Sequence, residues 1–188
     1  QSGRSYYRTV VRRTLDYVLA ELTDPQGGFC CGQDADSEGV EGKYYVFTPE
    51  ELVRHLGSEA ELFCRRFGVT GRGNFEGKSI PNLLKNEAYE AVWENHESPD
   101  LKKLYDYRIT RTRLHRDDKI LVSWNGWMIC ACAKAGAVLD DTNYLDMAAR
   151  AETFIHENLV RDGRLMVRYR EGDSAGEGKL DDYACYIL

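Results

Sequence analysis

The chain has 188 residues, of which 43% are hydrophobic and 30% charged, and its formal net charge is −6. This is enough apolar material for one sizeable core, while an acidic chain lacks the basic face that nucleic-acid binding requires. No apolar run approaches the roughly 20 residues that a membrane-spanning helix needs, so we expect one domain over residues 1–188 with neither a nucleic-acid nor a membrane partner.

The first predicted element is an amphipathic helix over 4–22. Tyr7, Val11 and Leu15 begin an apolar stripe with a period near 3.6 residues. The segment DPQGG then ends the helix. Two short strands, expected at 29–31 and 43–47, would pair as a hairpin.

The stretch between these strands, QDADSEGVEG, crowds carboxylates beside glycines. Three interpretations are open: a calcium loop, an active-site loop and a solvated turn. Asp34, Asp36 and Glu38 match the opening of an EF-hand loop, but Tyr45 occupies the twelfth position, where that loop needs glutamate. In extended backbone Asp34 and Asp36 share one side, and paired carboxylates can divide acid and base roles.

A helix is expected after Thr48, which forms a capping box with Glu51. A second short helix over 58–67 should end at Gly68.

The glycine-rich segment GVTGRGNFEGKSIPN, residues 68–82, comes next. Its glycine spacing differs from that of a dinucleotide-binding loop, although a phosphate-binding loop stays an alternative. Polar helices are predicted around 86–93 and over 98–114.

The segment SWNGWMICACAKAGAVL, residues 123–139, is apolar nearly all round and rich in small side chains, which is typical of a helix buried among others. Ser123 is the predicted N-cap. Asn125 would then lie in the first turn, where helix N–H groups favour a hydroxyl or an oxyanion. Trp124 is either a core side chain or part of a site. An amphipathic helix over 142–159 should pack beside this one.

The segment after this helix repeats an earlier plan. In each half an outer helix is followed by an Asp-Ser pair, spaced glycines and a lysine, over 24–43 and again over 162–179. Repeated helical pairs are typical of stacked or closed arrays, here a buried ring of helices inside an amphipathic one, with its loops at one mouth. Asp181 and Asp182 either favour the dipole of the next helix or bring a second acidic pair to that mouth.

Six cysteines are present and none forms a Cys-x-x-Cys pair. Since the histidines lack partners at ligand spacing, a zinc site is not expected. Cys130 and Cys132 should point to different faces of their helix. Buried, reduced cysteines favour a cytoplasmic location. The sequence stops in an apolar run, LDDYACYIL, without a helix stop, so we expect it to be part of a longer chain.

Four stretches together resemble a known family: GGFCCGQDADSEGVEGKYYVFTPEEL, FGVTGRGNFEGKSIPNLL, DDKILVSWNGWMICACAKAG, and GRLMVRYREG followed by LDDYACYIL. They are similar to the thioredoxin-domain-containing family that includes spermatogenesis-associated protein 20 and bacterial YyaL-like proteins. The resemblance implies a mostly α fold with short β-hairpins. By this resemblance the chain would be part of a six-hairpin (α/α) toroid akin to N-acylglucosamine 2-epimerases and six-hairpin glycosidases. The toroid would be incomplete at its C-terminus, and the thioredoxin-like domain would be absent.

By this analogy we expect a carbohydrate-active domain, epimerase-like or glycoside hydrolase-like, that uses carboxylate acid/base chemistry. The alternative is a non-catalytic scaffold that binds a sugar or a protein. A toroid that is cut open exposes helix faces, so self-association is expected. No cofactor and no metal are predicted. The predicted catalytic residues are Asp34, Asp36, Glu38, Asp181 and Asp182, and the predicted substrate-binding residues are Tyr45, Asn74, Glu76, Trp124 and Asn125.

Overall fold

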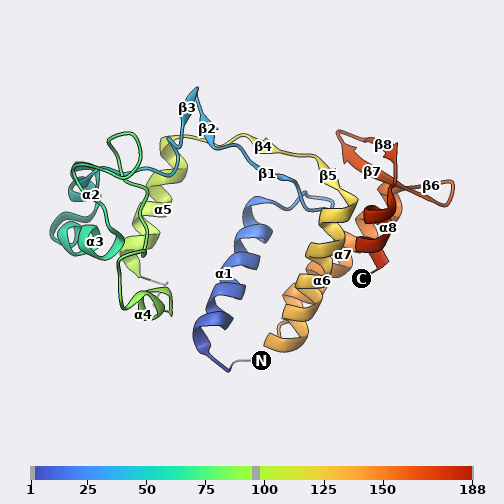
Figure 1. The fold of residues 1–188 in the computed structure, drawn as a ribbon, viewed down its shortest axis with the longest axis horizontal. Helices are drawn as coiled ribbons and strands as arrows, with labels where there is room; N and C mark the ends of the chain where they lie inside the picture. The colour runs from blue at the N-terminus through green and yellow to red at the C-terminus, as the bar shows by residue number, and fades with distance from the viewer. Residues whose placement is uncertain (1–2, 95–97, 188) are drawn as a thin grey trace. The chain divides into compact units, whose positions relative to one another are not determined.

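The computed structural model describes residues 3–94 and 98–187 (Figure 1). The chain divides into two compact units. Unit 1 comprises the described parts of 1–9 and 34–115, and unit 2 the described parts of 10–33 and 116–188. Helices account for more residues than strands in each unit, which confirms the mostly α class. Within the described ranges, no helix has both the length and the apolar character that crossing a membrane would take.

The helix α1 (Ser5–Glu21) forms close to its predicted bounds and contributes its residues from Val10 onward to unit 2. Leu15 and Val18 are buried in the core of that unit. The hydroxyl of Tyr144 donates a hydrogen bond of 2.8 Å to Asp16 on α1. Burial, reinforced by this acidic partner, raises the pKa of Tyr144 to about 12.

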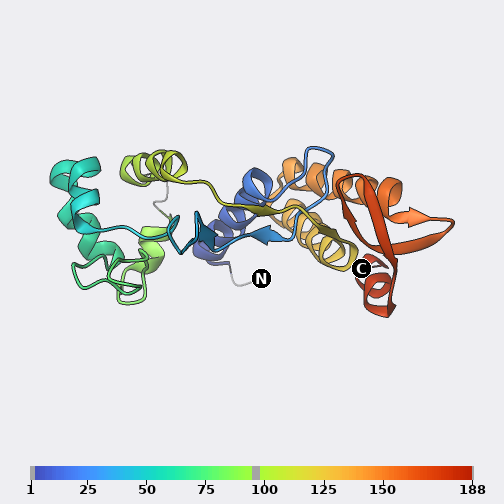
Figure 2. The same cartoon turned by 90° about the horizontal axis from the view of Figure 1, so that it is seen from above.

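The helices α6 (Val122–Leu139) and α7 (Thr142–Leu159) lie side by side in both views of unit 2 (Figures 1 and 2). A two-residue connection joins them, in which Asp140 adopts a left-handed backbone with φ of 53°. Small residues let the neighbours approach closely, as predicted. A Cβ placed on Gly126 would lie 2.3 Å from the carbonyl oxygen of Cys185 on α8 (Leu180–Ile187).

The strands of unit 2 complete its core. The strand β7 (Arg164–Arg170) pairs with β5 (Ile120–Leu121), β6 (Val160–Arg161) and β8 (Asp173–Glu177), always antiparallel. Ile120 and Leu165 point into a cluster with Phe154, Ile155 and Leu159 of α7. A second small ladder pairs β1 (Gly32–Gln33) with β4 (Arg116–Asp117).

Unit 1 is built from short helices around its own core. They are α2 (Pro49–Leu56), the 3-10 helix η1 (Gly57–Glu59), α3 (Ala60–Phe67), α4 (Tyr89–Glu94) and α5 (Pro99–Arg111). Phe47, Leu52, Phe63 and Leu104 are among the buried residues of this core. The predicted capping box of Thr48 and Glu51 is confirmed, and so is the left-handed end of α3 at Gly68.

The predicted hairpin of strands 29–31 and 43–47 is wrong. Phe29 bridges Thr23, and Phe47 bridges Ser79 of the glycine-rich segment. The acidic stretch itself forms the hairpin, from β2 (Asp36–Ser37) and β3 (Val40–Glu41). Its glycines permit the tight turn that a Gly-rich acidic sequence favours.

The expectation that 123–139 is buried on every side is also wrong for the described residues. Trp124, Trp127 and Val138 of α6 are 58%, 59% and 71% exposed. Cys132 is buried and Cys130 only partly so, as the two-residue spacing predicts. Burial raises the pKa of the Cys132 thiol to about 11.

The internal repeat is not reproduced in the backbone. The Asp-Ser pair at Asp36 begins the β2–β3 hairpin, whereas the matching pair at Asp173 begins β8, which pairs over its length with β7. The apolar run at the end of the chain forms α8, and Leu188 lies outside the described residues.

Arg111, at the end of α5, ties the helices of unit 1 to the irregular chain after the hairpin. Its guanidinium donates to the carbonyl oxygens of Lys43 and Tyr44, both at 2.9 Å, and to Glu51 at 3.2 Å. Glu51 also accepts from the N–H of Thr48 and from the hydroxyl of Tyr107. Burial alone would raise the pKa of Glu51, but these donors outweigh it and the pKa lies below its ordinary value.

We predict that Glu51→Gln lowers the free energy of unfolding at neutral pH by about 1–2 kcal/mol, because charge-assisted hydrogen bonds become neutral ones. Since the folded-state pKa of Glu51 is depressed, its stabilisation is present above the ordinary pKa of 4.5 and is lost as the pH falls through the folded-state value. Urea denaturation of both proteins at a series of pH values measures this.

The exposed neighbour Glu50 supplies the control. Glu50→Gln should change the free energy of unfolding by less than about 0.5 kcal/mol. A Glu51→Gln effect that is equally large in acid would contradict the assignment.

Candidate functional site

The acidic hairpin of unit 1 presents its carboxylates to solvent. Asp34 and Asp36 are exposed, and the N–H of Asp36 lies 3.5 Å from Asp34 Oδ1. Glu38 occupies the turn with φ of 55°. It forms an ion pair with Lys43 and accepts a hydrogen bond from Thr112 at 3.2 Å. The hydrogen bond from Lys43 and, to a smaller extent, that from Thr112 lower the pKa of Glu38.

The aromatic residues beside the hairpin are occupied by neighbours. Tyr45 is half-buried and meets the ring of Tyr44 edge-on, with centroids 5.2 Å apart. Tyr44 is buried, and the guanidinium of Arg108 lies 4.6 Å from its ring centroid. Arg111 lies 4.8 Å from the centroid of Phe47 in the same manner. Two of these aromatic rings, those of Tyr44 and Phe47, are therefore faced by arginines.

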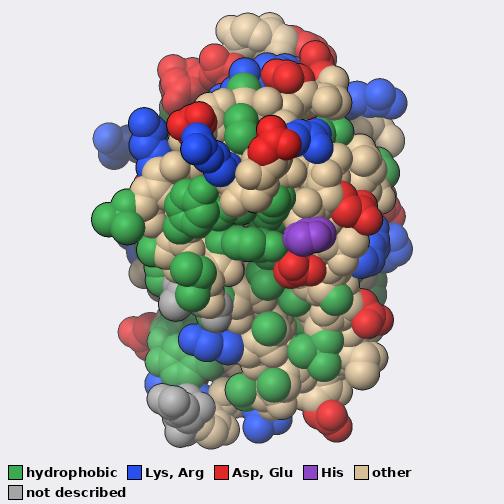
Figure 3. Space-filling model, turned by 90° about the vertical axis from the view of Figure 1, so that its right-hand side faces the viewer, with side chains coloured by type: hydrophobic (Ala, Val, Ile, Leu, Met, Phe, Trp, Pro, Cys, Tyr) green, Lys and Arg blue, Asp and Glu red, His purple; other side chains and the backbone are tan. Residues whose placement is uncertain are grey.

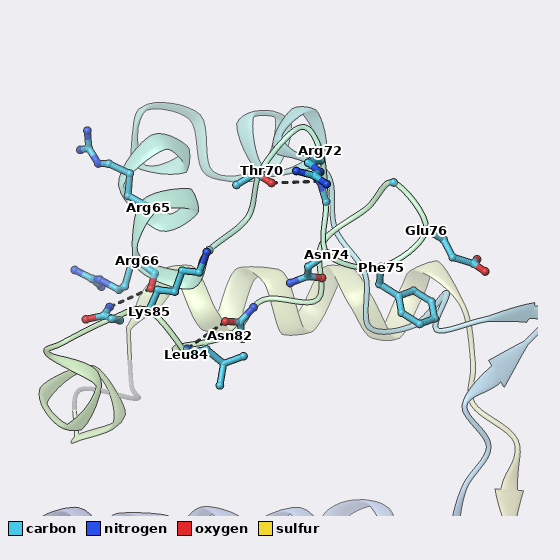
Figure 4. A pocket seen from close by; sticks show the side chains of 14 residues that line it. Arg65, Arg66, Thr70, Arg72, Asn74, Phe75, Glu76, Asn82, Leu84 and Lys85 are labelled. Carbon is cyan, nitrogen blue, oxygen red and sulfur yellow. Dashed lines mark hydrogen bonds between the residues drawn. The ribbon is translucent and has the colours of Figure 1, made fainter.

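The glycine-rich segment of unit 1 lines a cavity of about 660 Å³ (Figure 4). Phe75 and Lys78 pair across a two-residue turn in which Glu76 and Gly77 have φ of 45° and 76°. Gly73 is required for this geometry, since its φ is 73° and a Cβ would lie 2.2 Å from the carbonyl oxygen of Lys78. Asn74 and Glu76, both predicted from the sequence, belong to the lining.

Phe75 joins the two motifs of unit 1. Its ring lies against Gly42 at the base of the acidic hairpin, where a Cβ would approach the ring to 2.9 Å. The structure thus brings the glycine-rich segment next to the hairpin. The predicted carboxylates Asp34, Asp36 and Glu38 nevertheless are not among the residues that line the cavity.

Three asparagine amides hold the cavity wall. Asn74 donates to the carbonyl oxygen of Ile80 and accepts from its N–H, at 2.9 and 2.8 Å. Asn82 donates to the same carbonyl and accepts from Leu84 N–H, and Asn86 donates to the carbonyl of Arg66 and accepts from the N–H of Ala88. Each amide keeps one N–H and one lone pair for a ligand.

Basic side chains surround these amides. Arg65, Arg66, Arg72 and Lys85 line the cavity together with the single acidic residue Glu76. Sequence reasoning missed the basic residues as well as Asn82 and Asn86. The signal that was present is a cluster of Arg and Lys on both sides of the glycine-rich segment.

Asn125 of unit 2 is a buried structural group. It donates both N–H groups, to the carbonyl oxygens of Phe29 and Leu121 at 2.9 Å, and accepts from Phe29 N–H at 2.7 Å. Ser123 is not the N-cap, because α6 begins at Val122 and its N-cap is Leu121. The side chain of Trp124, the neighbour of Asn125, is exposed.

Asp181 and Asp182 open α8 in unit 2. Asp182 is 3% exposed and accepts a hydrogen bond of 2.8 Å from Lys179 N–H, which caps the helix. Asp181 is exposed. The interpretation that these residues favour the helix N-terminus accounts for Asp182. A catalytic meeting of these aspartates with those of unit 1 stays a prediction.

The placement of ligating side chains bears on metal binding. In residues 3–94 and 98–187, no group of three or more His, Cys, Asp or Glu side chains is arranged to hold an ion. The acidic hairpin therefore does not supply the ligand set that the calcium interpretation requires.

Comparison with known proteins identifies relatives over most of the chain. It is 28% identical over 99% of its length to spermatogenesis-associated protein 20 of Homo sapiens and 27% identical over 87% to that of Mus musculus. It is 31% identical over 90% of its length to an uncharacterised protein of Caenorhabditis elegans. The chain spans only 25–29% of the length of these relatives. No protein-family model matches it.

We predict that Asn125→Ala lowers the free energy of unfolding by about 3 kcal/mol, because it leaves buried backbone groups of Phe29 and Leu121 without partners. Chemical denaturation followed by circular dichroism measures the loss. Lys134→Ala, at an exposed position of the same helix, is the control and should be nearly neutral. Equal stabilities of the two variants would refute the structural role of Asn125.

Proposed function

Because this chain belongs to the family of spermatogenesis-associated protein 20, we propose that it is a ligand-binding domain of a longer protein, and that the cavity beside the glycine-rich segment takes a carbohydrate. The observation that carries the proposal is the set of asparagine amides in the cavity wall. Each is fixed by two backbone hydrogen bonds and keeps a donor and an acceptor.

Fixed amides suit the recognition of sugar hydroxyls. A hydroxyl group both donates and accepts, so an amide with one free N–H and one free lone pair complements it. The ligand would not have to order these side chains on binding, which lowers the entropic cost. The cavity volume of about 660 Å³ lies within the range of small-molecule sites.

The proposal assigns no reaction to the acidic hairpin. Its carboxylates lie outside the cavity lining, and Glu38 is engaged by Lys43 and Thr112. Of the two functions expected from the sequence, binding without catalysis is therefore the better supported by unit 1.

Binding without conversion is tested with a mixture of neutral monosaccharides and disaccharides. We expect saturable, millimolar to micromolar binding by ligand-observed NMR, with amide shifts concentrated in residues 70–86, and no new product by mass spectrometry. Asn74→Ala should weaken binding about tenfold or more, since a bound hydroxyl loses both partners. Asn158→Ala, which also removes an amide bonded to backbone, is the matched control.

Asp36→Asn separates the two candidate functions. It should leave sugar binding unchanged if the hairpin has no part in the site. Formation of a product by the unaltered protein, abolished by Asp36→Asn, would overturn the binding-domain proposal in favour of carboxylate catalysis.

We also propose that the helices are part of the (α/α) toroid that the resemblance implies. The α6–α7 pair of unit 2, joined by two residues, has the form of a helical hairpin. Trp124, Trp127 and Val138 recur at helical spacing along one exposed side of α6, as expected of a helix that further helices would cover.

Exposed apolar side chains support the proposed self-association of this chain. Figure 3 shows a face on which hydrophobic side chains gather across the middle, below a mixed band of acidic and basic groups. Burial of apolar surface between copies is favourable. We predict a concentration-dependent increase in mass by light scattering, reduced when Trp124 and Trp127 are both replaced by Gln. A monomer at all concentrations would exclude it.

A further inference from the structure

We propose that the ligand of the unit 1 cavity carries a negative group, as a phosphorylated or carboxylated sugar does, and that Lys85 and Arg72 hold it. This inference rests on the proposed function in taking the cavity as a ligand site. The inference adds to that function a statement about the charge of the ligand, because the asparagine amides alone do not select a charged ligand over a neutral one.

The charge of the cavity is opposite to that of the chain. The formal net charge of the whole protein is −6, yet the lining contains four basic side chains and one acidic one. Figure 4 shows the acidic side chain, Glu76, on the far side of the loop from Lys85 and directed away from Asn74. A concave surface lined by one sign of charge concentrates ligands of the opposite sign.

Two of the four basic residues have a structural explanation. Arg65 and Arg66 lie in the last turn of α3, where positive side chains complement the helix dipole. Arg65 also pairs with Glu61 at 2.8 Å. Figure 4 shows both side chains pointing away from the glycine-rich segment.

Arg72 and Lys85 have no such explanation. Neither lies in a helix, and neither has a carboxylate partner among the residues that the structure describes. Lys85 extends from its loop toward the glycine-rich segment (Figure 4). Unpaired cations beside fixed amides form the donor set that a phosphate or carboxylate group requires.

The backbone on either side of Lys85 is held in place. The N–H of Asn82 donates to the carbonyl of Phe67 at 2.8 Å, and the amide of Asn86 donates to that of Arg66 at 3.0 Å. A second cavity shares Arg65, Arg66, Lys85 and Asn86 with the first, and its other lining residues are Leu62, Glu87, Ala88, Ala91 and Val92. Lys85 thus borders both cavities, and the proposed anion lies beside it.

The test compares glucose 6-phosphate, glucuronate and glucose by NMR titration of the 188-residue chain, with inorganic phosphate as competitor. At an ionic strength of about 0.02 M we expect glucose 6-phosphate to bind at least about tenfold more tightly than glucose. Glucuronate distinguishes a carboxylate site from a phosphate site. Raising the ionic strength to about 0.5 M should remove most of the difference.

Lys85→Gln and Arg72→Gln should each weaken glucose 6-phosphate about five- to tenfold while leaving glucose unchanged. Lys103→Gln, an exposed lysine on α5, is the matched control and should change neither. The salt dependence of the unaltered protein provides the second measurement if a variant fails to fold.

Each outcome is decisive. Equal affinities for glucose and glucose 6-phosphate, or an unchanged affinity in Lys85→Gln, would overturn the anion site and leave the carbohydrate proposal standing. Binding of none of the four probes would overturn both.

Discussion

The constraint on which both units depend is that every backbone polar group removed from water needs a partner where a helix meets irregular chain. In unit 2 the buried amide of Asn125 meets this need by binding Phe29 on one side and Leu121 on the other. It thereby ties the start of α6 to the segment after α1. In unit 1 the guanidinium of Arg111 does the same between the end of α5 and the carbonyls of Lys43 and Tyr44. Removing either group would leave these backbone groups without partners.

The same constraint builds the cavity of unit 1. The last carbonyls of α3 have no partners within the helix. The carbonyl of Cys64 accepts from the N–H groups of Gly68 and Val69. That of Phe67 accepts from the N–H of Asn82, and that of Arg66 from the side-chain amide of Asn86. Closing the helix in this way draws the chain back across its end and leaves a hollow between helix and loop. The cavity that we propose as a binding site is therefore a consequence of how α3 is capped.

Local patterns were predictable from the sequence and pairing partners were not. The bounds of α1 and α7, the capping box at Thr48 and the end of α3 at Gly68 follow from rules that act within one or two turns. The pairing of Phe47 with Ser79 depends on contacts distant in sequence, and no local rule selects it. The exposure of Trp124 likewise depends on which surfaces are present to cover α6. Asn74 and Glu76 were predicted because they lie in the stretch FGVTGRGNFEGKSIPNLL, which resembles the family, whereas Lys85 is the first residue after it.

A polar residue type in a motif does not by itself distinguish structure from chemistry. Asn125 and Asn74 are both amides in motifs selected from the sequence, and both bind backbone. Asn125 donates both of its N–H groups inside a core, so nothing is left to donate to a ligand. Asn74 uses one donor and one acceptor on an exposed loop and keeps the others. The donors and acceptors that a side chain keeps after its hydrogen bonds within the fold are therefore our criterion for a candidate site. By this criterion we propose the glycine-rich segment of unit 1, and not the acidic hairpin, as the site.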